Sequence, residues 1–464
     1  MAAKSILIGG TASHVGKSWT ATAICRWLRR RGISVAPFKA QNMSLNSYPC
    51  RTGGEIGRAQ VAQAEACGLE PVSDMNPILL KPNSSMGSQV VVDGKVWRNL
   101  SAREYYQHHD FLLERVLAAF RRLASEYEFI VIEGAGSIAE MNLRATDLVN
   151  LGLARRIGAP VLLVADIDRG GVFASIVGTL ALLDPDEAAL VRSFAVNRFR
   201  GDPSLFADGV RFLEQRTARP CLGVFPWIDA PLDDEDSVSL EGRNGSSSAV
   251  AILRFPRISN FTDFRLLPDA RWIDVPLDQQ FDCVILPGSK NTIADLEWLR
   301  SRGLDVWIDG QRRSGARIVG ICGGYQMLGE RIDDPDGVES GRGSAQGLGL
   351  LPVRTVLARE KTTRVVEAAT PAGHRFQAYE IHMGITERPA GCPPFALLPD
   401  GKEGVRLNGC IGTYLHGALE DAAVVEEMLG LRVAAPASKC ETYDRLADWF
   451  EAHADIRRFE ELYL

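Results

Sequence analysis

The sequence predicts an α/β protein built from two open sheets of mostly parallel strands. Short β-branched runs alternate with helical periods through the first half, and a second alternation of this kind begins at residue 249. Such alternation favours parallel strands joined by right-handed crossovers. The segment between them is rich in acids, glycine and serine, which is typical of a linker. We therefore expect domains at residues 1–228 and 249–464, joined by a linker at 229–248.

The expected strands are apolar, β-branched runs bounded by turn residues. In the first half they lie at Ser5–Ile8, Ser34–Phe38, Phe129–Ile132, Val161–Ala165 and Ser193–Val196, and in the second at Ala249–Leu253, Cys283–Leu286 and Arg317–Ile321. Apolar residues at helical spacing predict helices between the first strands. These helices lie at Lys17–Arg31, Gly57–Cys67, Ala102–Ser125 and Leu205–Arg216.

Composition and charge exclude several classes of function. The 464 residues include 52 Lys and Arg against 58 Asp and Glu, so the formal net charge is −6 and argues against nucleic acid as a partner. No apolar run approaches the length of about 20 residues that a helix needs to cross a bilayer. The sequence also shows no signal-peptide pattern. Nine cysteines without a C-x-x-C pair predict buried thiols. We expect a cytoplasmic protein with small-molecule partners and no membrane contact, with no expectation about its oligomeric state.

A glycine-rich loop between the first strand and the first helix indicates nucleotide binding. Its sequence from Gly10 to Ser18 is Gly-Thr-Ala-Ser-His-Val-Gly-Lys-Ser, one residue longer than the common phosphate loop. The backbone N–H groups of such a loop wrap phosphates, and the helix N-terminus adds positive potential. Lys17 would reach the β- and γ-phosphates of ATP, and Ser18 would hold Mg²⁺. We expect Gly10, Thr11, Gly16, Lys17 and Ser18 to bind ATP.

Two charged residues end strands on the same side of the predicted sheet. Glu133 follows the strand Phe129–Ile132, and open parallel sheets bind ligands at the carboxyl ends of their strands. A carboxylate that faces Ser18 is suited to hold Mg²⁺ or to order a water. Lys39 ends the second strand, so we expect it near the γ-phosphate, with a solvated surface lysine as the alternative.

A second chemical motif surrounds Cys322. The strand Arg317–Ile321 leads into this cysteine, and Gly323 and Gly324 follow before a helix. This pattern is typical of a nucleophile elbow, a strained turn that exposes a side chain at a helix N-terminus. The N–H of Gly323 is then placed to stabilise an oxyanion. The alternative, a buried structural thiol, fits most of the other cysteines better than it fits Cys322.

A thiol nucleophile needs a base, and the chain offers seven histidines. His416 lies in the segment Gly-Thr-Tyr-Leu-His-Gly, after a short strand-like run, and His382 lies in Tyr-Glu-Ile-His-Met-Gly. Spacing alone leaves both histidines open as the base.

Together these motifs resemble the cobyric acid synthases, the glutamine-dependent amidases of cobalamin biosynthesis. The resemblance covers essentially the whole chain. Besides the phosphate loop and the cysteine elbow, it rests on Pro37–Met43, Gly54–Gln60, Met75–Pro82, Glu133–Ser137, Ala165–Phe173, Asn197–Asp202, Leu286–Thr292, Tyr379–Gly384 and Tyr414–Gly417. It implies a P-loop NTPase-like first domain similar to dethiobiotin synthetase. It also implies a second domain that resembles the flavodoxin-like class I glutamine amidotransferases.

The resemblance also implies roles for residues of the second domain. Cys322 becomes the nucleophile and His416 its base, while Gly288, Ser289 and Gly323 bind the oxyanion. Class I amidotransferases usually carry a Glu two residues after this histidine, where the chain has Ala418. The group that orients His416 is therefore left open, with Glu420 as a candidate.

In the first domain, the resemblance implies that Glu55 and Glu133 hold Mg²⁺ beside Ser18, and that Asn197 contacts the adenine of ATP. The implied reaction consumes ATP and glutamine to amidate the b, d, e and g propionates of (adenosyl)cobyrinic acid a,c-diamide. One alternative is the related synthase that makes this a,c-diamide. Another is a partitioning-type P-loop ATPase, which would give the Cys322 elbow no role.

Overall fold

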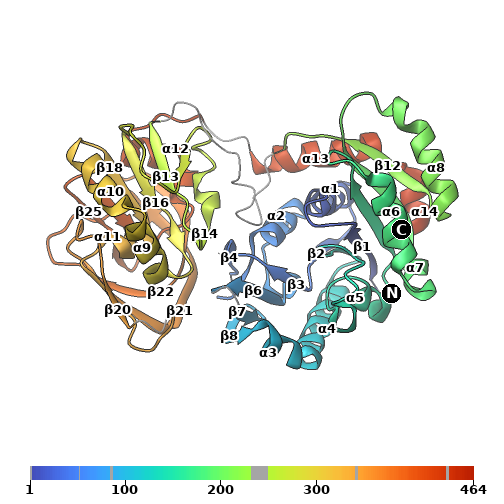
Figure 1. Ribbon diagram of the computed structural model, residues 1–464, viewed down its shortest axis with the longest axis horizontal. Coiled ribbons are helices and arrows are strands. Elements are labelled where there is room, and N and C mark those ends of the chain that lie inside the picture. The colour runs from blue at the N-terminus through green and yellow to red at the C-terminus, as the bar shows by residue number, and fades with distance from the viewer. Residues whose placement is uncertain (1–2, 52, 84–86, 231–248, 340–342, 435–437) are drawn as a thin grey trace.

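The computed structural model describes residues 3–51, 53–83, 87–230, 249–339, 343–434 and 438–464. Two lobes lie side by side, the first built mainly from the N-terminal half and the second from the described residues between 249 and 434 (Figure 1). Residues 231–248 of the expected linker lie outside the described residues.

The first lobe is organised around a six-stranded, fully parallel sheet in the order β12-β11-β10-β1-β9-β2. The five strands expected from the sequence are present, and β12 is an addition. Their bounds are β1 (Lys4–Gly10), β2 (Val35–Phe38), β9 (Phe129–Glu133), β10 (Val161–Asp166), β11 (Val191–Phe199) and β12 (Cys221–Pro226).

Both faces of this sheet are covered, as the continuous apolar runs of its strands require. Successive side chains point to opposite faces, so Ile6 and Ile8 of β1 pack on one side and Leu7 on the other. The first face carries α1 (Lys17–Arg30) and α2 (Arg58–Ala66). The sequence did not predict three further helices of the first lobe, α5 (Leu151–Ile157), α6 (Val172–Leu182) and α7 (Pro185–Leu190). The expected helix Leu205–Arg216 is present as α8 (Ala207–Thr217).

A smaller sheet, β3-β6-β7-β8, lies beside the large one. Its strands are β3 (Gln41–Met43), β6 (Ile78–Pro82), β7 (Gly87–Val92) and β8 (Lys95–Ser101), and a short hairpin pairs β4 (Ser47–Pro49) with β5 (Glu55–Gly57). The expected helix 102–125 was wrong as a single element. It is divided into α3 (Ala102–Gln107) and α4 (His109–Glu126), because the backbone of His108 leaves helical geometry.

The second lobe also has a six-stranded sheet, in the order β15-β13-β16-β18-β26-β25, with only β25 antiparallel. The bounds are β13 (Val250–Leu253), β15 (Arg271–Ile273), β16 (Cys283–Leu286), β18 (Arg317–Ile321), β25 (Val405–Leu407) and β26 (Cys410–Thr413). The helices beside it are α9 (Thr292–Ser301), α10 (Leu304–Arg313), α11 (Gly323–Leu328) and α12 (Ala422–Leu429).

A long antiparallel hairpin extends the second lobe. It joins β21 (Arg354–Ala369) to β22 (Arg375–Glu387), in a sheet with β19 (Arg331–Asp333), β20 (Ser344–Gln346), β23 (Ala396–Leu398) and β24 (Gly401–Glu403). A two-residue pair, β14 (Ile258–Ser259) with β17 (Gly288–Ser289), adjoins the end of β16.

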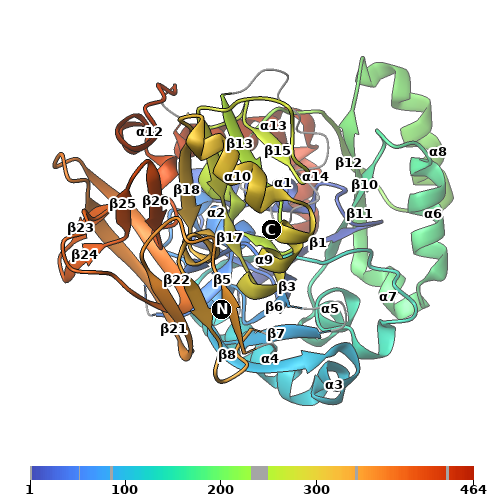
Figure 2. The same cartoon turned by 60° about the vertical axis from the view of Figure 1, so that its left-hand side comes forward.

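The last two helices return to the first lobe. α13 (Lys439–His453) lies beside α1, and α14 (Ile456–Tyr463) follows it on the same face of the first sheet (Figures 1 and 2). Phe450 and Phe459 pack edge-on against Trp27, with ring centroids 5.6 and 5.5 Å apart. The domain limits 1–228 and 249–464 stay a prediction. The sequence analysis did not predict that α13 and α14 pack on the first lobe.

Candidate active site

The phosphate loop has the geometry that its sequence requires. Gly16, just before α1, has φ 99°, and a Cβ there would collide with the amide of Asn197. The Nζ atom of Lys17 donates to the carbonyl oxygens of Ala12 (3.0 Å) and Gly136 (2.9 Å), so it lies over the loop that would hold the phosphates. The side-chain amide of Asn197 donates to the carbonyl oxygen of Val15 at 2.9 Å, which ties it to the phosphate loop. A contact of Asn197 with adenine stays a prediction.

Glu133 sits at the centre of a buried polar cluster next to this loop. Its Oε1 atom accepts from Ser18 Oγ at 2.8 Å and from Lys39 Nζ at 3.0 Å, while Gln63 donates to its other oxygen. Burial raises the pKa of Glu133, but the charge of Lys39 and these hydrogen bonds outweigh it and lower the pKa. Lys39 is only 3% exposed, so the solvated alternative was wrong.

This cluster fits Mg²⁺ of the kind that phosphate loops bind. An ionised carboxylate next to a serine hydroxyl supplies hard oxygen ligands, and Mg²⁺ usually takes one or two of these together with phosphates and waters. Among the described residues, no three His, Cys, Asp or Glu side chains form a closed metal cage.

Glu55 lies in a different environment from that of Glu133. Its carboxylate accepts from Lys81 Nζ at 2.8 Å, from Ser47 Oγ at 3.0 Å, and from Lys361 of the second lobe. Burial raises the pKa of Glu55, but the two lysines more than offset it and lower the pKa. The structure therefore joins Glu55 to lysines rather than to Ser18, and its role as a metal ligand stays a prediction.

Cys322 occupies a strained turn between β18 and α11. Its φ of 53° and ψ of −110° lie outside the usual regions for a residue with a side chain. A Cβ on Gly324 would collide with the carbonyl oxygen of Leu286, so only glycine allows α11 to begin so close to β16. The thiol is 7% exposed, and its Sγ lies 3.6 Å from the carbonyl oxygen of Ile381.

His416, just after β26, is fully buried and faces this thiol. Its Nδ1 lies 2.7 Å from Oδ2 of Asp263, whose other oxygen accepts from the N–H of Gly417 at 2.8 Å. Burial lowers the pKa of His416, but the charge of Asp263 and the contact with Cys322 raise it to about 10. Within the described residues, its Nε2 has no hydrogen-bond partner at ordinary distance, which leaves it available to the reacting groups.

Asp263 is the functional residue that sequence reasoning missed. Glu420 was the wrong candidate, because it pairs with Arg58 at 3.0 Å and Arg265 at 3.1 Å. The sequence held one signal: Asp263 is an acid inside the segment Phe-Thr-Asp-Phe, and a carboxylate among aromatic residues needs a buried partner.

The three expected oxyanion residues gather around Cys322. A Cβ on Gly323 would lie 2.8 Å from the amide nitrogen of Ser289, and a Cβ on Gly288 would lie 3.2 Å from Cε1 of His416. Both glycines are therefore required by close packing at the reacting centre. Their binding of an oxyanion stays a prediction.

His382 lies near Cys322 but has other contacts. Its Nδ1 lies 2.8 Å from the carbonyl oxygen of Gly384, and its ring stacks on Tyr414 at 3.8 Å. With Cys322 it lines a cavity of about 40 Å³, which has room for about one water. Two residues of the first lobe, Leu45 and Lys81, help to line that cavity.

The contact between the lobes therefore runs over the thiol site. Besides the pair of Lys361 with Glu55, the ring of Tyr48 packs at a tilt against that of Tyr379, with centroids 4.9 Å apart. The amide nitrogen of Ser47 also donates to Oδ1 of Asn260 at 3.0 Å. Tyr379 in turn stacks on His416 at 5.3 Å. A chain of direct contacts thus links the first lobe to the histidine.

Two family models and a relative of known name match this chain. Residues 6–237 match the CobQ/CobB/MinD/ParA nucleotide binding domain, and residues 249–424 match the CobB/CobQ-like glutamine amidotransferase domain. A cobyric acid synthase of Syntrophobacter fumaroxidans is 45% identical over 99% of this chain and 98% of its own length. The chain belongs to the cobyric acid synthase family. Its fold is a P-loop-like parallel sheet followed by a glutamine amidotransferase domain, and as a family member it is an ATP-dependent, glutamine-hydrolysing amidoligase.

Solved structures resemble this cobyric acid synthase family member only in part. A glutamine amidotransferase covers 40% of this chain and 100% of its own, with 18% identity and a TM-score of 0.33. PurLQS from Thermotoga maritima covers 43% and 96%, with 16% identity and a TM-score of 0.29. No helix in the described part of the chain is both long and apolar enough to span a membrane.

Proposed function

We propose that this protein amidates the b, d, e and g propionates of (adenosyl)cobyrinic acid a,c-diamide to give (adenosyl)cobyric acid. It would use ammonia from glutamine and activate each carboxylate with ATP. The observation that carries the proposal is a buried Cys322–His416–Asp263 arrangement in the same chain as a phosphate loop with Glu133 beside Ser18. The 45% identity to a cobyric acid synthase supports the corrinoid as substrate.

In the glutaminase half, the Sγ–H proton of Cys322 passes to Nε2 of His416 as the sulfur attacks the side-chain carbonyl carbon of glutamine. Negative charge collects on the oxygen, which the N–H groups of Ser289 and Gly323 are suited to stabilise. His416, held as the cation by Asp263, donates its Nε2 proton to the departing nitrogen as the C–N bond breaks. Water then cleaves the thioester, which releases glutamate and restores the thiol.

In the synthetase half, a propionate oxygen attacks the γ-phosphorus of ATP. An O–P bond forms, the bond to the β-phosphate oxygen breaks, and ADP leaves. Ammonia attacks the resulting acyl phosphate, phosphate departs, and a proton is lost to give the amide. ATP is needed because an unactivated carboxylate has no adequate leaving group.

Lys17 and Lys39 supply positive charge where the phosphate oxygens gain negative charge. Mg²⁺, with Ser18 and Glu133 as the residues that would hold it, would neutralise part of the remaining phosphate charge. The carboxylate of Glu133 is ionised at neutral pH, because its pKa is lowered.

The test is mass spectrometry of cobyrinic acid a,c-diamide incubated with the enzyme, Mg·ATP and glutamine. We expect four successive replacements of OH by NH₂ with the wild type. Cys322→Ala should make no amide from glutamine but should regain amidation with ammonium, because only the supply of ammonia is lost. Cys283→Ala, which removes another buried thiol of the second lobe, is the matched control and should use glutamine.

Other outcomes would favour the alternatives. Two amidations of cobyrinic acid, with the diamide left unchanged, would indicate the a,c-diamide synthase. ATP hydrolysis that is insensitive to Cys322→Ala, without amidation of either corrinoid, would indicate the ATPase switch.

A further inference from the structure

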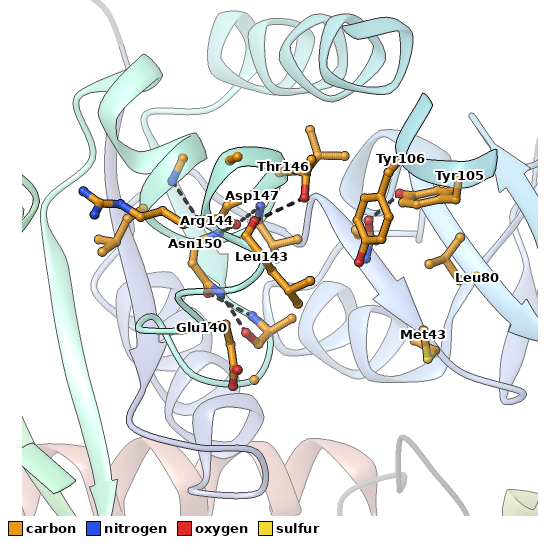
Figure 3. Close-up of a pocket in the computed structure, with 18 of the residues that line it drawn as sticks. Met43, Leu80, Tyr105, Tyr106, Glu140, Leu143, Arg144, Thr146, Asp147 and Asn150 are labelled. Carbon is orange, nitrogen blue, oxygen red and sulfur yellow. Dashed lines mark hydrogen bonds between the residues drawn. The ribbon is translucent and has the colours of Figure 1, made fainter. Parts of the chain in front are cut away.

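A cavity of about 1250 Å³ lies in the first lobe, close to the phosphate loop (Figure 3). Strands β6–β8 and helix α3 form one wall, and the segment from Ala135 to Arg156 forms most of the other. Sites for drug-sized ligands usually measure about 300–1,000 Å³, so this cavity has room for a larger molecule. The mechanism proposed above assigns it no role.

Apolar side chains face the cavity from both walls. Met43 and Tyr106 lie on one side and Leu143 on the other (Figure 3), and Met141 adjoins Leu143. These four are 40–57% exposed, although large apolar side chains are normally buried. Exposed apolar surface gathered in one concave site marks a place where a ligand covers it. Two facing apolar walls suit both faces of a flat ring.

One end of the cavity adjoins the phosphate loop. Ala135, Gly136 and Ser137 line the cavity, and the carbonyl oxygen of Gly136 accepts from Lys17 Nζ at 2.9 Å. Asn150 fixes this turn, with Nδ2 donating to the carbonyl of Ala135 at 2.8 Å and Oδ1 accepting from its N–H at 3.1 Å. A carboxylate at this end of the cavity therefore lies next to the lysine that would bind the γ-phosphate.

Three arginines line the cavity, and among the described residues two of them, Arg155 and Arg156, have no acidic partner. Arg144 pairs with Glu187 and Asp184, and Asp147 accepts three N–H groups of its own loop. Arg155, in the last turn of α5, is exposed and forms no ion pair with any residue in the described ranges. Arg156, beside it, donates to the carbonyl oxygen of Gly152 at 2.6 Å. Glu140 is the acid near the phosphate end.

We propose that this cavity binds the corrinoid, with the ring between the two apolar walls, one propionate at Gly136 and Lys17, and another carboxylate on Arg155. The inference rests on the proposed function. A flat macrocycle with several peripheral carboxylates matches the cavity in size, in its apolar walls and in its cationic rim.

The test is equilibrium binding of cobyrinic acid a,c-diamide to the full-length protein, without ATP or glutamine. The quenching of protein fluorescence measures the binding. Leu143→Glu places a charge on an apolar wall and should raise Kd by about 10- to 100-fold. Arg155→Ala should raise Kd by about 10-fold, as the loss of a charged hydrogen bond predicts. Thermal unfolding of each variant shows that it has folded.

Matched controls lie outside the cavity. Leu205→Glu changes a leucine that is 84% exposed, and Arg216→Ala changes an arginine in the last turn of α8. Both should keep the wild-type Kd. If the wild type amidates the diamide but Leu143→Glu and Arg155→Ala keep its Kd, the cavity is not the corrinoid site. If the wild type neither binds nor amidates the diamide, the proposed function itself fails.

Discussion

Asp263 and His416 form a charge pair with no contact with solvent. Asp263 is 1% exposed and His416 is fully buried, so neither charge is stabilised by water. Each is stable only because the other is present, and Gly417 satisfies the second oxygen of the carboxylate. A histidine held in this way keeps one tautomer and one orientation toward Cys322, which is what a proton donor to a leaving nitrogen requires.

Asp263→Asn should therefore impair glutamine hydrolysis more than folding. Removal of the carboxylate from a catalytic histidine costs about 10⁴-fold in kcat in the best-studied triad, and we expect a loss of about 10²- to 10⁴-fold here. The measurement is release of glutamate by Asp263→Asn beside Asp269→Asn, a change at an exposed acid of the same segment. Equal activity in the two variants would contradict the role of Asp263.

The pH dependence follows from the same pair. The pKa of His416 is raised from 6.5 to about 10, so the pairing is complete below pH 6.5 and is lost as pH rises through about 10. Glutaminase activity that needs the imidazolium should fall on the alkaline side near that value. In Asp263→Asn the raising charge is gone and burial lowers the pKa, so the alkaline limb of kcat/KM should move to lower pH. An unmoved limb would show that another group titrates.

At the scale of elements, the strained turn at Cys322 depends on how closely α11 approaches β18 and β16. Gly320 and Gly324 lie so near each other that a Cβ on Gly320 would sit 2.6 Å from the carbonyl carbon of Gly324. A larger residue would push the helix away and carry Gly323 and its N–H with it. The glycines therefore fix the position of Cys322 as well as the fold of the turn.

Gly324→Ala should destabilise the protein by about 1–3 kcal/mol, as other overpacked sites do. It should also reduce glutamine hydrolysis more than ammonia-dependent amidation, because the displaced element belongs to the glutaminase half. Denaturant unfolding and the two activities measure this. Gly310→Ala in α10 is the control, since a Cβ there meets no atom within 4 Å and should stabilise the helix by about 0.5–1 kcal/mol. Normal stability of Gly324→Ala would refute the packing argument.

At the scale of the whole molecule, the end of the chain completes the core where the chain begins. Phe450 is fully buried and contacts Trp27, Phe225 and Phe459. Ion pairs add to this packing, with Arg26 bonded to Asp444 at 2.8 and 2.9 Å. The lobe that carries the phosphate loop therefore depends on residues beyond the amidotransferase lobe.

Phe450→Ala should destabilise the first lobe by about 3–5 kcal/mol, the usual cost of deleting a buried aromatic ring. ATP binding should be lost at lower denaturant concentration, while glutamine hydrolysis should respond less. Phe212→Ala, at a ring that is 54% exposed, should stay within about 0.5 kcal/mol of the wild type. The reverse order of effects would mean that α13 stabilises the second lobe instead.

Much of the fold and of the site could be predicted because it is encoded in short stretches of chain. The strands Cys283–Leu286 and Arg317–Ile321 have the predicted bounds, since continuous β-branched runs at the centre of a sheet have few alternatives. The phosphate loop and the Cys322 elbow are likewise local, because glycine at positive φ or under a close neighbour decides the turn. Ser18 and Glu133 come together because parallel strands end at one edge.

By itself, the sequence determined the two parallel sheets, the phosphate loop, the turn at Cys322 and the family resemblance. Tertiary structure alone decided that Asp263 orients His416, that Glu55 faces two lysines, and that α13 and α14 close the first core. Asp263 and His416 are 153 residues apart, and no periodicity or spacing encodes such a pairing. It arises when burial leaves a carboxylate and an imidazole with only each other to neutralise their charges.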